Sequence, residues 1–162
     1  NSYDGYHDPS ESTYFFAGQT SKHDNGREDR VFKWRYCKPV GLTAYESTTW
    51  LSWTEYDDTW TRECEGNSAI TRATSKHNNG REDRIWHFQC GYLDTDSYGF
   101  DNCAWTSDFQ NEWDGYLNFD CPSNGVIQGI YSEHNNGRED RRFKFKCCEI
   151  VNAGDMSFSD ST

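Results

Sequence analysis

The sequence His134-Asn135-Asn136-Gly137-Arg138-Glu139-Asp140-Arg141 occurs, almost unchanged, three times in this 162-residue chain. The other two copies run from His23 to Arg30, with Asp at the second position, and from His77 to Arg84. The three histidines are 54 and 57 residues apart. Since chance does not produce three such matches, the chain is predicted to consist of three repeats of one structural unit.

The residues that follow each copy alternate between apolar and polar side chains, which is typical of a half-buried β-strand. Partner strands are expected upstream, at residues 14–20, 69–74 and 126–131. Asn-Gly between two strands is a strong hairpin signal, because both residues tolerate positive φ. Each copy is therefore predicted to be the turn of a hairpin. The side chains expected to face inward are Phe32, Trp34, Tyr36, Trp86, Phe88, Cys90, Phe143, Phe145 and Cys147.

The repeats predict one all-β domain over residues 1–151, with internal pseudo-threefold symmetry of a β-trefoil-like or β-prism-like kind. Because a single repeat cannot bury its apolar face, the three units are expected to fold together. The repeat boundaries are placed at about 1–37, 38–90 and 91–148. The polar C-terminal tail, residues 152–162, is expected to fray.

The composition favours a packed extracellular domain. Aromatic residues reach 17%, whereas disordered chains are poor in them. The net charge of −11 argues against nucleic acid or an anionic membrane as the main partner. The sequence has no apolar run long enough to span a membrane, so membrane insertion is not expected. The chain starts at Asn1 without an initiator Met, so we expect a processed, secreted protein.

The seven cysteines match no zinc or Cys-x-x-Cys redox pattern, which favours disulfides in an oxidising compartment. The midpoint of Cys64 and Cys90 is the motif histidine at 77, as expected for a bridge that closes an antiparallel hairpin. The midpoint of the cysteines at 121 and 147 is likewise the histidine at 134. Cys37 then has no predicted partner in the chain, so it is expected either to form an interchain disulfide or to remain a free thiol. Two further bridges are expected among Cys103, Cys121, Cys147 and Cys148, with Cys121 bonded to one of the adjacent pair.

The turns are expected to present ligand-binding groups on the surface. Asn amides, Arg guanidinium groups and Glu carboxylates offer paired donors and acceptors for sugar hydroxyls or an acetamido group. The arginines could equally hold a sulfate or a carboxylate of an acidic glycan. Nearby Trp rings could cover the apolar face of a sugar. The candidate ligand-binding residues are His23, Asn25, Arg27, Glu28, Arg30, His77, Asn79, Arg81, Glu82, Arg84, His134, Asn136, Arg138, Glu139, Arg141, Trp34 and Trp86.

Two alternatives stay open for these residues. Asp29, Asp83 and Asp140, with the arginine after each, fit equally well a set of ion pairs that lock the hairpins together. The Trp rings fit a core position as well as a sugar platform. The order of acidic residues does not match a calcium loop, and no nucleophile or phosphate-loop motif occurs. No metal, cofactor or enzymatic activity is therefore expected.

The third unit carries the pattern of a known family. It reads Cys121-Pro122-Ser123-Asn124-Gly125-Val126-Ile127 and then Glu139-Asp140-Arg141-Arg142-Phe143-Lys144-Phe145-Lys146-Cys147-Cys148. This sequence resembles the dermatopontin family from about Asp4 to Glu149, and the near-identical motif copies make it similar to the invertebrate lectin branch. The resemblance implies a secreted lectin for N-acetylhexosamine or related glycans, acting multivalently in haemagglutination or cell aggregation as a homo-oligomer. The alternative is a matrix or adhesion protein with protein or proteoglycan partners.

Overall fold

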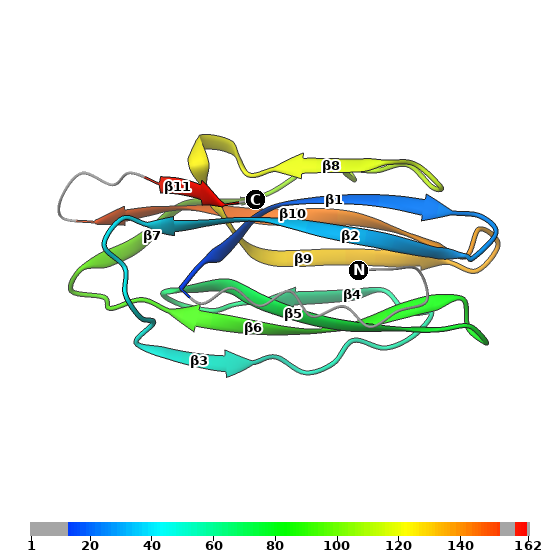
Figure 1. The fold of residues 1–162 in the computed structure, drawn as a ribbon, viewed down its shortest axis with the longest axis horizontal. Helices are drawn as coiled ribbons and strands as arrows, with labels where there is room; N and C mark the ends of the chain where they lie inside the picture. Colours follow the sequence, from blue (N-terminus) through cyan, green and yellow to red (C-terminus); the bar gives the residue numbers. More distant parts are fainter. Residues whose placement is uncertain (1–12, 153–157, 162) are drawn as a thin grey trace.

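The computed structural model describes residues 13–152 and 158–161, and over these ranges the regular secondary structure consists of β-strands and one short 3-10 turn, joined by loops (Figure 1). The three long antiparallel hairpins are hairpin 1, β1 (Phe15–Asp24) with β2 (Asp29–Pro39); hairpin 2, β5 (Ser68–Asn78) with β6 (Asp83–Tyr92); and hairpin 3, β9 (Val126–Asn135) with β10 (Asp140–Asn152). The shorter elements are β3 (Ser47–Trp50), β4 (Trp60–Glu63), β7 (Tyr98–Trp105), β8 (Leu117–Asp120), η1 (Pro122–Asn124) and β11 (Phe158–Ser161). The predicted all-β class and the three hairpins are confirmed.

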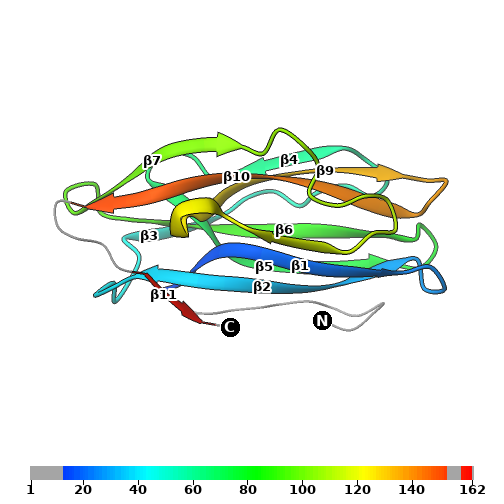
Figure 2. The ribbon, with the colours of Figure 1, turned by 90° about the horizontal axis from the view of Figure 1, so that it is seen from above.

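The spacers between the hairpins exchange strands among the sheets. The strand orders are β11-β2-β1-β8, β4-β9-β10-β7 and β3-β6-β5. The strand that precedes hairpin 2, β4, pairs with β9 of hairpin 3, and the strand that precedes hairpin 3, β8, pairs with β1 of hairpin 1. The sheets of hairpins 1 and 3 therefore each contain a strand from another repeat's spacer, whereas the sheet of hairpin 2 contains β3 from the spacer of its own repeat. The three hairpin tips lie together at one end of the molecule, on the right in Figures 1 and 2.

The C-terminal tail differs from the sequence expectation. Residues Phe158–Ser161 form β11, which pairs antiparallel with β2, with Phe158 opposite Pro39. The expectation of a fraying tail is wrong for this segment, because β2 offers an edge whose backbone groups accept a further strand. Strand pairing uses backbone groups, so the polar composition of the tail did not predict it.

The core is aromatic, as the alternation predicted. The inward-facing residues of the three second strands are between 0 and 8% exposed. The ring of Phe32 meets that of Trp86 edge to face, with centroids 4.7 Å apart, and that of Phe143 at 6.0 Å. These three residues occupy the same position in the three hairpins, so the hairpins pack against one another through edge-to-face aromatic contacts.

Three disulfides join Cys64 to Cys90, Cys121 to Cys147, and Cys103 to Cys148. The predicted Cys64–Cys90 bridge is confirmed, and so is the bond from Cys121 to one of the adjacent pair. The Cys64–Cys90 bridge does not close its hairpin, because the cross-strand partner of Cys90 is Ile70. Cys64 instead follows β4 and donates its backbone N–H to Gln128 of β9 at 2.9 Å. The bridge thus ties hairpin 2 to the sheet of hairpin 3.

Cys37 lies outside the three disulfides, and its side chain is 1% exposed. It packs in a smaller apolar cluster, separate from the main aromatic core, together with Phe15, Leu42 and Val126. This burial does not fit the interchain bond that was one of the two sequence-based expectations.

A closed ring of ion pairs joins the three hairpins where their second strands begin. In each pair, an arginine donates through Nε and Nη2 to both oxygens of an aspartate on another hairpin. The pairs, with their N–O distances, are Arg84–Asp29 (3.1 and 2.6 Å), Arg141–Asp83 (2.7 and 2.7 Å) and Arg30–Asp140 (2.6 and 2.8 Å). All six residues are 3–4% exposed. Hairpin 2 thus bonds to 1, hairpin 3 to 2 and hairpin 1 to 3, so the ring closes only when all three have assembled.

We expect Asp140→Asn to lower the free energy of unfolding by about 3–5 kcal/mol, because it removes the carboxylate that neutralises the buried Arg30 guanidinium. Denaturant unfolding followed by Trp fluorescence measures this loss. The matched control is Asp120→Asn, which weakens the exposed ion pair with Arg35 and is expected to cost about 1 kcal/mol or less. Equal losses in the two variants would contradict a special role for the ring.

Candidate functional site

The motif copies form four-residue loops at the hairpin tips and not the two-residue Asn-Gly turns that were expected. The Oδ1 atom of Asp24, Asn78 or Asn135 accepts hydrogen bonds from the backbone N–H groups of the loop Gly and Arg, at 2.9 and 3.0 Å in each loop. Only an acceptor oxygen is needed, so Asp serves in the first loop as well as Asn does in the others. The Asn and Gly residues of these loops do not have the positive φ that was expected for them.

The left-handed residue of each loop is the glutamate. Glu28, Glu82 and Glu139 have φ values of 47°, 49° and 48°. A residue with a Cβ pays about 1–2 kcal/mol for this conformation. The same conformation occurs at the last loop residue of all three hairpins, immediately before the second strand begins.

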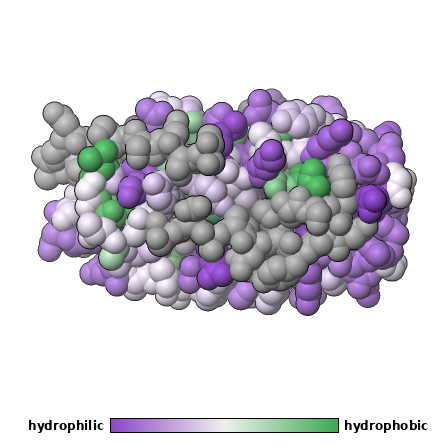
Figure 3. Space-filling view, in the orientation of Figure 1, coloured by the Kyte–Doolittle hydropathy of each residue, from purple (hydrophilic) through white to green (hydrophobic). Residues whose placement is uncertain are grey.

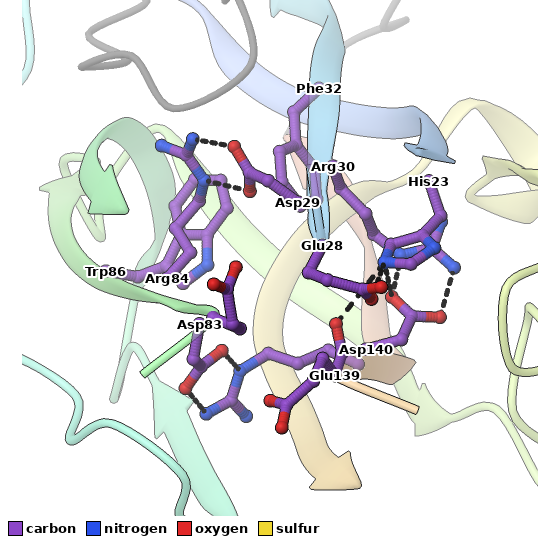
Figure 4. A pocket seen from close by; sticks show the side chains of 12 residues that line it. His23, Glu28, Asp29, Arg30, Phe32, Asp83, Arg84, Trp86, Glu139 and Asp140 are labelled. Carbon is purple, nitrogen blue, oxygen red and sulfur yellow. Dashed lines mark hydrogen bonds and ion pairs between the residues drawn. The ribbon is translucent and has the colours of Figure 1, made fainter. Parts of the chain in front are cut away.

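The three glutamates and the ion-pair ring line a narrow cavity between the hairpin tips (Figure 4). Its volume of about 20 Å³ has room for a single water molecule. Burial raises the pKa of Glu139, and the negative charges of Asp57, Glu82 and Glu28 raise it further, while His134 acts in the opposite direction. The mouth of the cavity is therefore a place where carboxylates crowd together.

The sequence analysis expected the motif histidines to be ligand-binding groups on the surface, but the structure places them in the interior. The side chains of His23, His77 and His134 are 0–1% exposed. Their Nδ1 atoms lie 2.9–3.0 Å from Oδ1 of the asparagine two residues later, which fixes the orientation of that amide. The Nε2 atoms of His23 and His77 approach the backbone carbonyls of Glu139 and Glu28, at 3.3 and 3.2 Å. All three histidines therefore position the asparagines, and His23 and His77 also connect neighbouring hairpins.

The loop arginines Arg27, Arg81 and Arg138 are on the surface, as expected. Arg81 and Arg138 are each paired with a spacer aspartate. Arg81 contacts Asp57 at 2.9 Å and Arg138 contacts Asp114 at 3.1 Å. The arginine side chains are 58% and 55% exposed. The backbone N–H groups of the two aspartates also donate to ring carboxylates, at 2.8 and 2.7 Å. The spacers are thus anchored to the ion-pair ring at the point where they reach the tips.

Sequence reasoning missed Asp57 and Asp114 as site residues. A signal was present, because Asp114-Gly115-Tyr116 precedes the third repeat and the same tripeptide occupies residues 4–6 before the first. Residues 4–6 lie outside the described part of the chain.

Three open clefts lie between neighbouring hairpin tips, with volumes of about 530, 580 and 420 Å³. Each combines the tip arginine of one hairpin with the motif Asn and Glu of the next, and the tip end is largely hydrophilic in Figure 3. We name the clefts by their arginines. The Arg27 cleft is lined by Asp24, Gly26, Arg27, Asn79 and Glu82; the Arg81 cleft by Asp57, Asn78, Gly80, Arg81, Asn136 and Glu139; and the Arg138 cleft by Asn25, Glu28, Asp114, Gly137, Arg138 and Glu139.

Besides the three histidines, five more of the candidate residues lie in the interior and not at a ligand surface. Trp34 and Trp86 are 6% and 1% exposed and pack in the aromatic core, so neither ring presents a face to solvent. Arg30, Arg84 and Arg141 belong to the ion-pair ring. For these residues the structural alternatives raised by the sequence are the ones observed.

Exposed aromatic rings occur instead on the outer face of hairpin 2. Trp50 and Trp53, which are 38% and 36% exposed, stack on the two sides of His87 with centroids 4.4 and 4.7 Å away. Arg72 lies over Trp50, and Lys76 over Trp53. Burial against these rings lowers the pKa of His87, partly offset by its backbone hydrogen bond.

Two groups of metal-ligand types occur among the described residues. They are His23 with Asp114 and Asp140, and His134 with Asp57 and Asp83. In each group the buried aspartate accepts both hydrogen bonds of a ring arginine, so its carboxylate is already committed.

None of the helical segments in the described ranges has the length and apolar character that crossing a membrane requires.

We expect Glu139→Gln to stabilise the protein at neutral pH. A carboxyl whose pKa is higher in the folded state makes that state lose stability as the pH rises from its ordinary value, 4.5, through the raised one. The gain in melting temperature over the unmodified protein should therefore be larger at pH 7 than at pH 4. Glu149→Gln, far along β10 from the tips, is the control. A gain independent of pH would contradict the crowding of charge.

Comparison with known proteins gives a family model and several similar proteins. The dermatopontin family model matches residues 1–153. The chain is 36% identical over 138 residues to the hemagglutinin/amebocyte aggregation factor of Limulus polyphemus, covering 82% of this chain and 76% of that protein. It is 35% identical over 89 residues to dermatopontin of Biomphalaria glabrata, covering 55% and 57% of the two chains. Millepora cytotoxin-1 of Millepora dichotoma is 34% identical over 98 residues, 60% of this chain and 42% of that one.

No solved structure matches the chain. The family match nevertheless extends over all three motif copies and their spacers, including the six bridged cysteines and the ring residues. The chain belongs to the dermatopontin family.

Proposed function

We propose that this protein is an extracellular lectin that binds N-acetylhexosamines or related glycans in the three tip clefts and acts without catalysis. The observation that carries the proposal is the repetition of one donor and acceptor set three times at one end of the molecule. Each set comes from two hairpins, and each cleft is open and large enough for a monosaccharide. The Limulus relative named as a hemagglutinin and aggregation factor supports this assignment.

The chemistry of each cleft suits an uncharged, hydroxyl-rich ligand. The buried histidine holds the motif Asn in one orientation, so the remaining polar atom of its amide is available to a ligand. The exposed guanidinium adds several donors, and the glutamate adds acceptors. Such preorganised polar groups are suited to sugar hydroxyls and to the amide of an acetamido group.

The placement of the clefts supports multivalent action and a homo-oligomer. Several weak sites on one face gain avidity on a glycan-rich surface when they are occupied together. Because the three clefts lie at the same end, one chain would engage one surface only. Linking two cells therefore requires at least two chains with their tips pointing apart.

We also propose that the three repeats are related by a pseudo-threefold axis through the ion-pair ring, with repeat boundaries near residues 37 and 90. The cyclic order of the ion pairs supports this, and so does the recurrence of one Arg, Asn and Glu set in all three clefts. A β-prism-like arrangement of three sheets accommodates both features better than a β-trefoil-like one, since each sheet is centred on one long hairpin.

Arg81→Ala combined with Arg138→Ala is expected to weaken N-acetylglucosamine binding in two clefts, below detection at the concentrations that saturate the unmodified protein, and to leave binding in the Arg27 cleft unchanged. Removing hydrogen bonds from a charged donor weakens binding by roughly tenfold to a hundredfold. In ¹H–¹⁵N NMR titrations of the unmodified protein, the side-chain amide signals of Asn25, Asn79 and Asn136 should all shift. In the double variant only the signal of Asn79, in the Arg27 cleft, should still shift.

The matched control is Arg35→Ala, which removes a half-buried, ion-paired arginine from outside the tips. Its three asparagine signals should respond as in the unmodified protein, and thermal melting should verify that every variant is folded. Unchanged sugar binding in the folded double variant would count against the tip clefts as the site.

The second candidate function is adhesion to a protein partner through the outer face of hairpin 2. The exposed stack of Trp50, His87 and Trp53 favours it, since aromatic side chains are enriched at protein interfaces. Haemagglutination discriminates between the two functions. Free N-acetylglucosamine inhibits a lectin, whereas an adhesin would be indifferent to the sugar and sensitive to Trp50→Ala with Trp53→Ala.

A further inference from the structure

The tip clefts are acidic, although each contains an arginine. Every cleft is lined by one guanidinium and at least two carboxylates. In the Arg81 cleft these are Asp57 and Glu139, and the Arg138 cleft has Asp114, Glu28 and Glu139. The local excess of negative charge has the same sign as the net charge of the chain, −11.

The arginines of two clefts are already neutralised by the protein. The Nη1 atom of Arg81 contacts Asp57, and that of Arg138 contacts Asp114. Both aspartates are held in place, because their backbone N–H groups donate to buried ring carboxylates. An anionic ligand that approached either arginine would meet a fixed carboxylate in the same position. The arginines are therefore poor anion receptors, although the residue type alone would suggest the opposite.

The three loop glutamates add further negative charge at the tips. The left-handed backbone at Glu28, Glu82 and Glu139 directs all three towards the space between the tips. The raised pKa of Glu139, due first to burial and then to neighbouring carboxylates, agrees with this crowding. The side chains of Glu28 and Glu139 remain about one-third exposed, within reach of a ligand.

We propose that the tip clefts select hexosamines without an acidic substituent, and that Glu28, Glu82 and Glu139 exclude sulfated and sialylated sugars. This selectivity rests on the proposed function, because it concerns the same clefts. Hydroxyl and amide groups of an uncharged sugar donate hydrogen bonds to the carboxylates. A sulfate or carboxylate offers only acceptors and adds like-charge repulsion, which at contact distance weakens binding by roughly fivefold or more.

The test compares N-acetylglucosamine with N-acetylglucosamine 6-sulfate, each titrated against the full chain while the asparagine side-chain amides are followed by NMR. At about 0.05 M salt the sulfated sugar should bind at least about fivefold more weakly. Raising the salt to about 0.5 M shortens the screening length from roughly 14 to roughly 4 Å, so the difference should narrow.

The decisive variant carries Glu28→Gln, Glu82→Gln and Glu139→Gln together. The ratio of sulfated to neutral affinity should rise by about fivefold or more, because the repulsion is removed and the amides can donate to sulfate. The matched control carries Glu46→Gln, Glu65→Gln and Glu149→Gln, which changes the net charge equally but away from the tips. In the control the ratio should stay that of the unmodified protein.

The outcomes separate the two proposals. Equal or tighter binding of the sulfated sugar by the unmodified protein would overturn the selectivity and leave the lectin assignment intact. An equal rise of the ratio in both triple variants would assign the effect to net charge and overturn the role of the three glutamates. Failure of both sugars to shift any tip amide would overturn the proposed function and the selectivity with it.

Discussion

The structure depends on one constraint, the burial of three arginines and three aspartates in a closed ring. Taking such charges out of water is unfavourable unless each finds its partner with good geometry. Here every guanidinium meets both oxygens of a carboxylate on a different hairpin, so no hairpin satisfies its own charges. The ring therefore gives the assembly its specificity: an arrangement that omits one hairpin leaves buried charge uncompensated.

The rest of the fold repeats this dependence of each unit on its neighbours. Spacer strands complete sheets centred on other repeats, and the Cys64–Cys90 bridge joins hairpin 2 to the sheet that contains β9. The aromatic layer of Phe32, Trp86 and Phe143 lies next to the ring and buries the apolar faces that a lone hairpin would expose. A single repeat would lack the ion-pair partners of its buried arginine and aspartate and would leave its aromatic face exposed, as is usual in repeat architectures.

The clefts at the tips inherit their geometry from the ring. The ring aspartates bind the backbone of Asp57 and Asp114, and those two residues hold the tip arginines. All three histidines fix the asparagines, and His23 and His77 also bond to the next hairpin. The loop glutamates face the common centre. The proposed binding groups are thus kept in place by rigid, buried neighbours, which reduces the entropy lost when a ligand binds.

The sequence by itself determined the three hairpins, their inward faces and the Cys64–Cys90 bridge, because alternation, turn signals and cysteine spacing are local or pairwise patterns. It also located the tips as the candidate site. Which of the adjacent cysteines bonds to Cys121 was decided by the structure. Only the tertiary structure decided which charges bind one another, since the partners of Asp29 and Arg84 lie on different repeats. It likewise placed Trp34, Trp86 and the histidines inside and brought the spacer aspartates to the tips. Burial and neighbours depend on how the repeats close around a common centre, which no single repeat encodes.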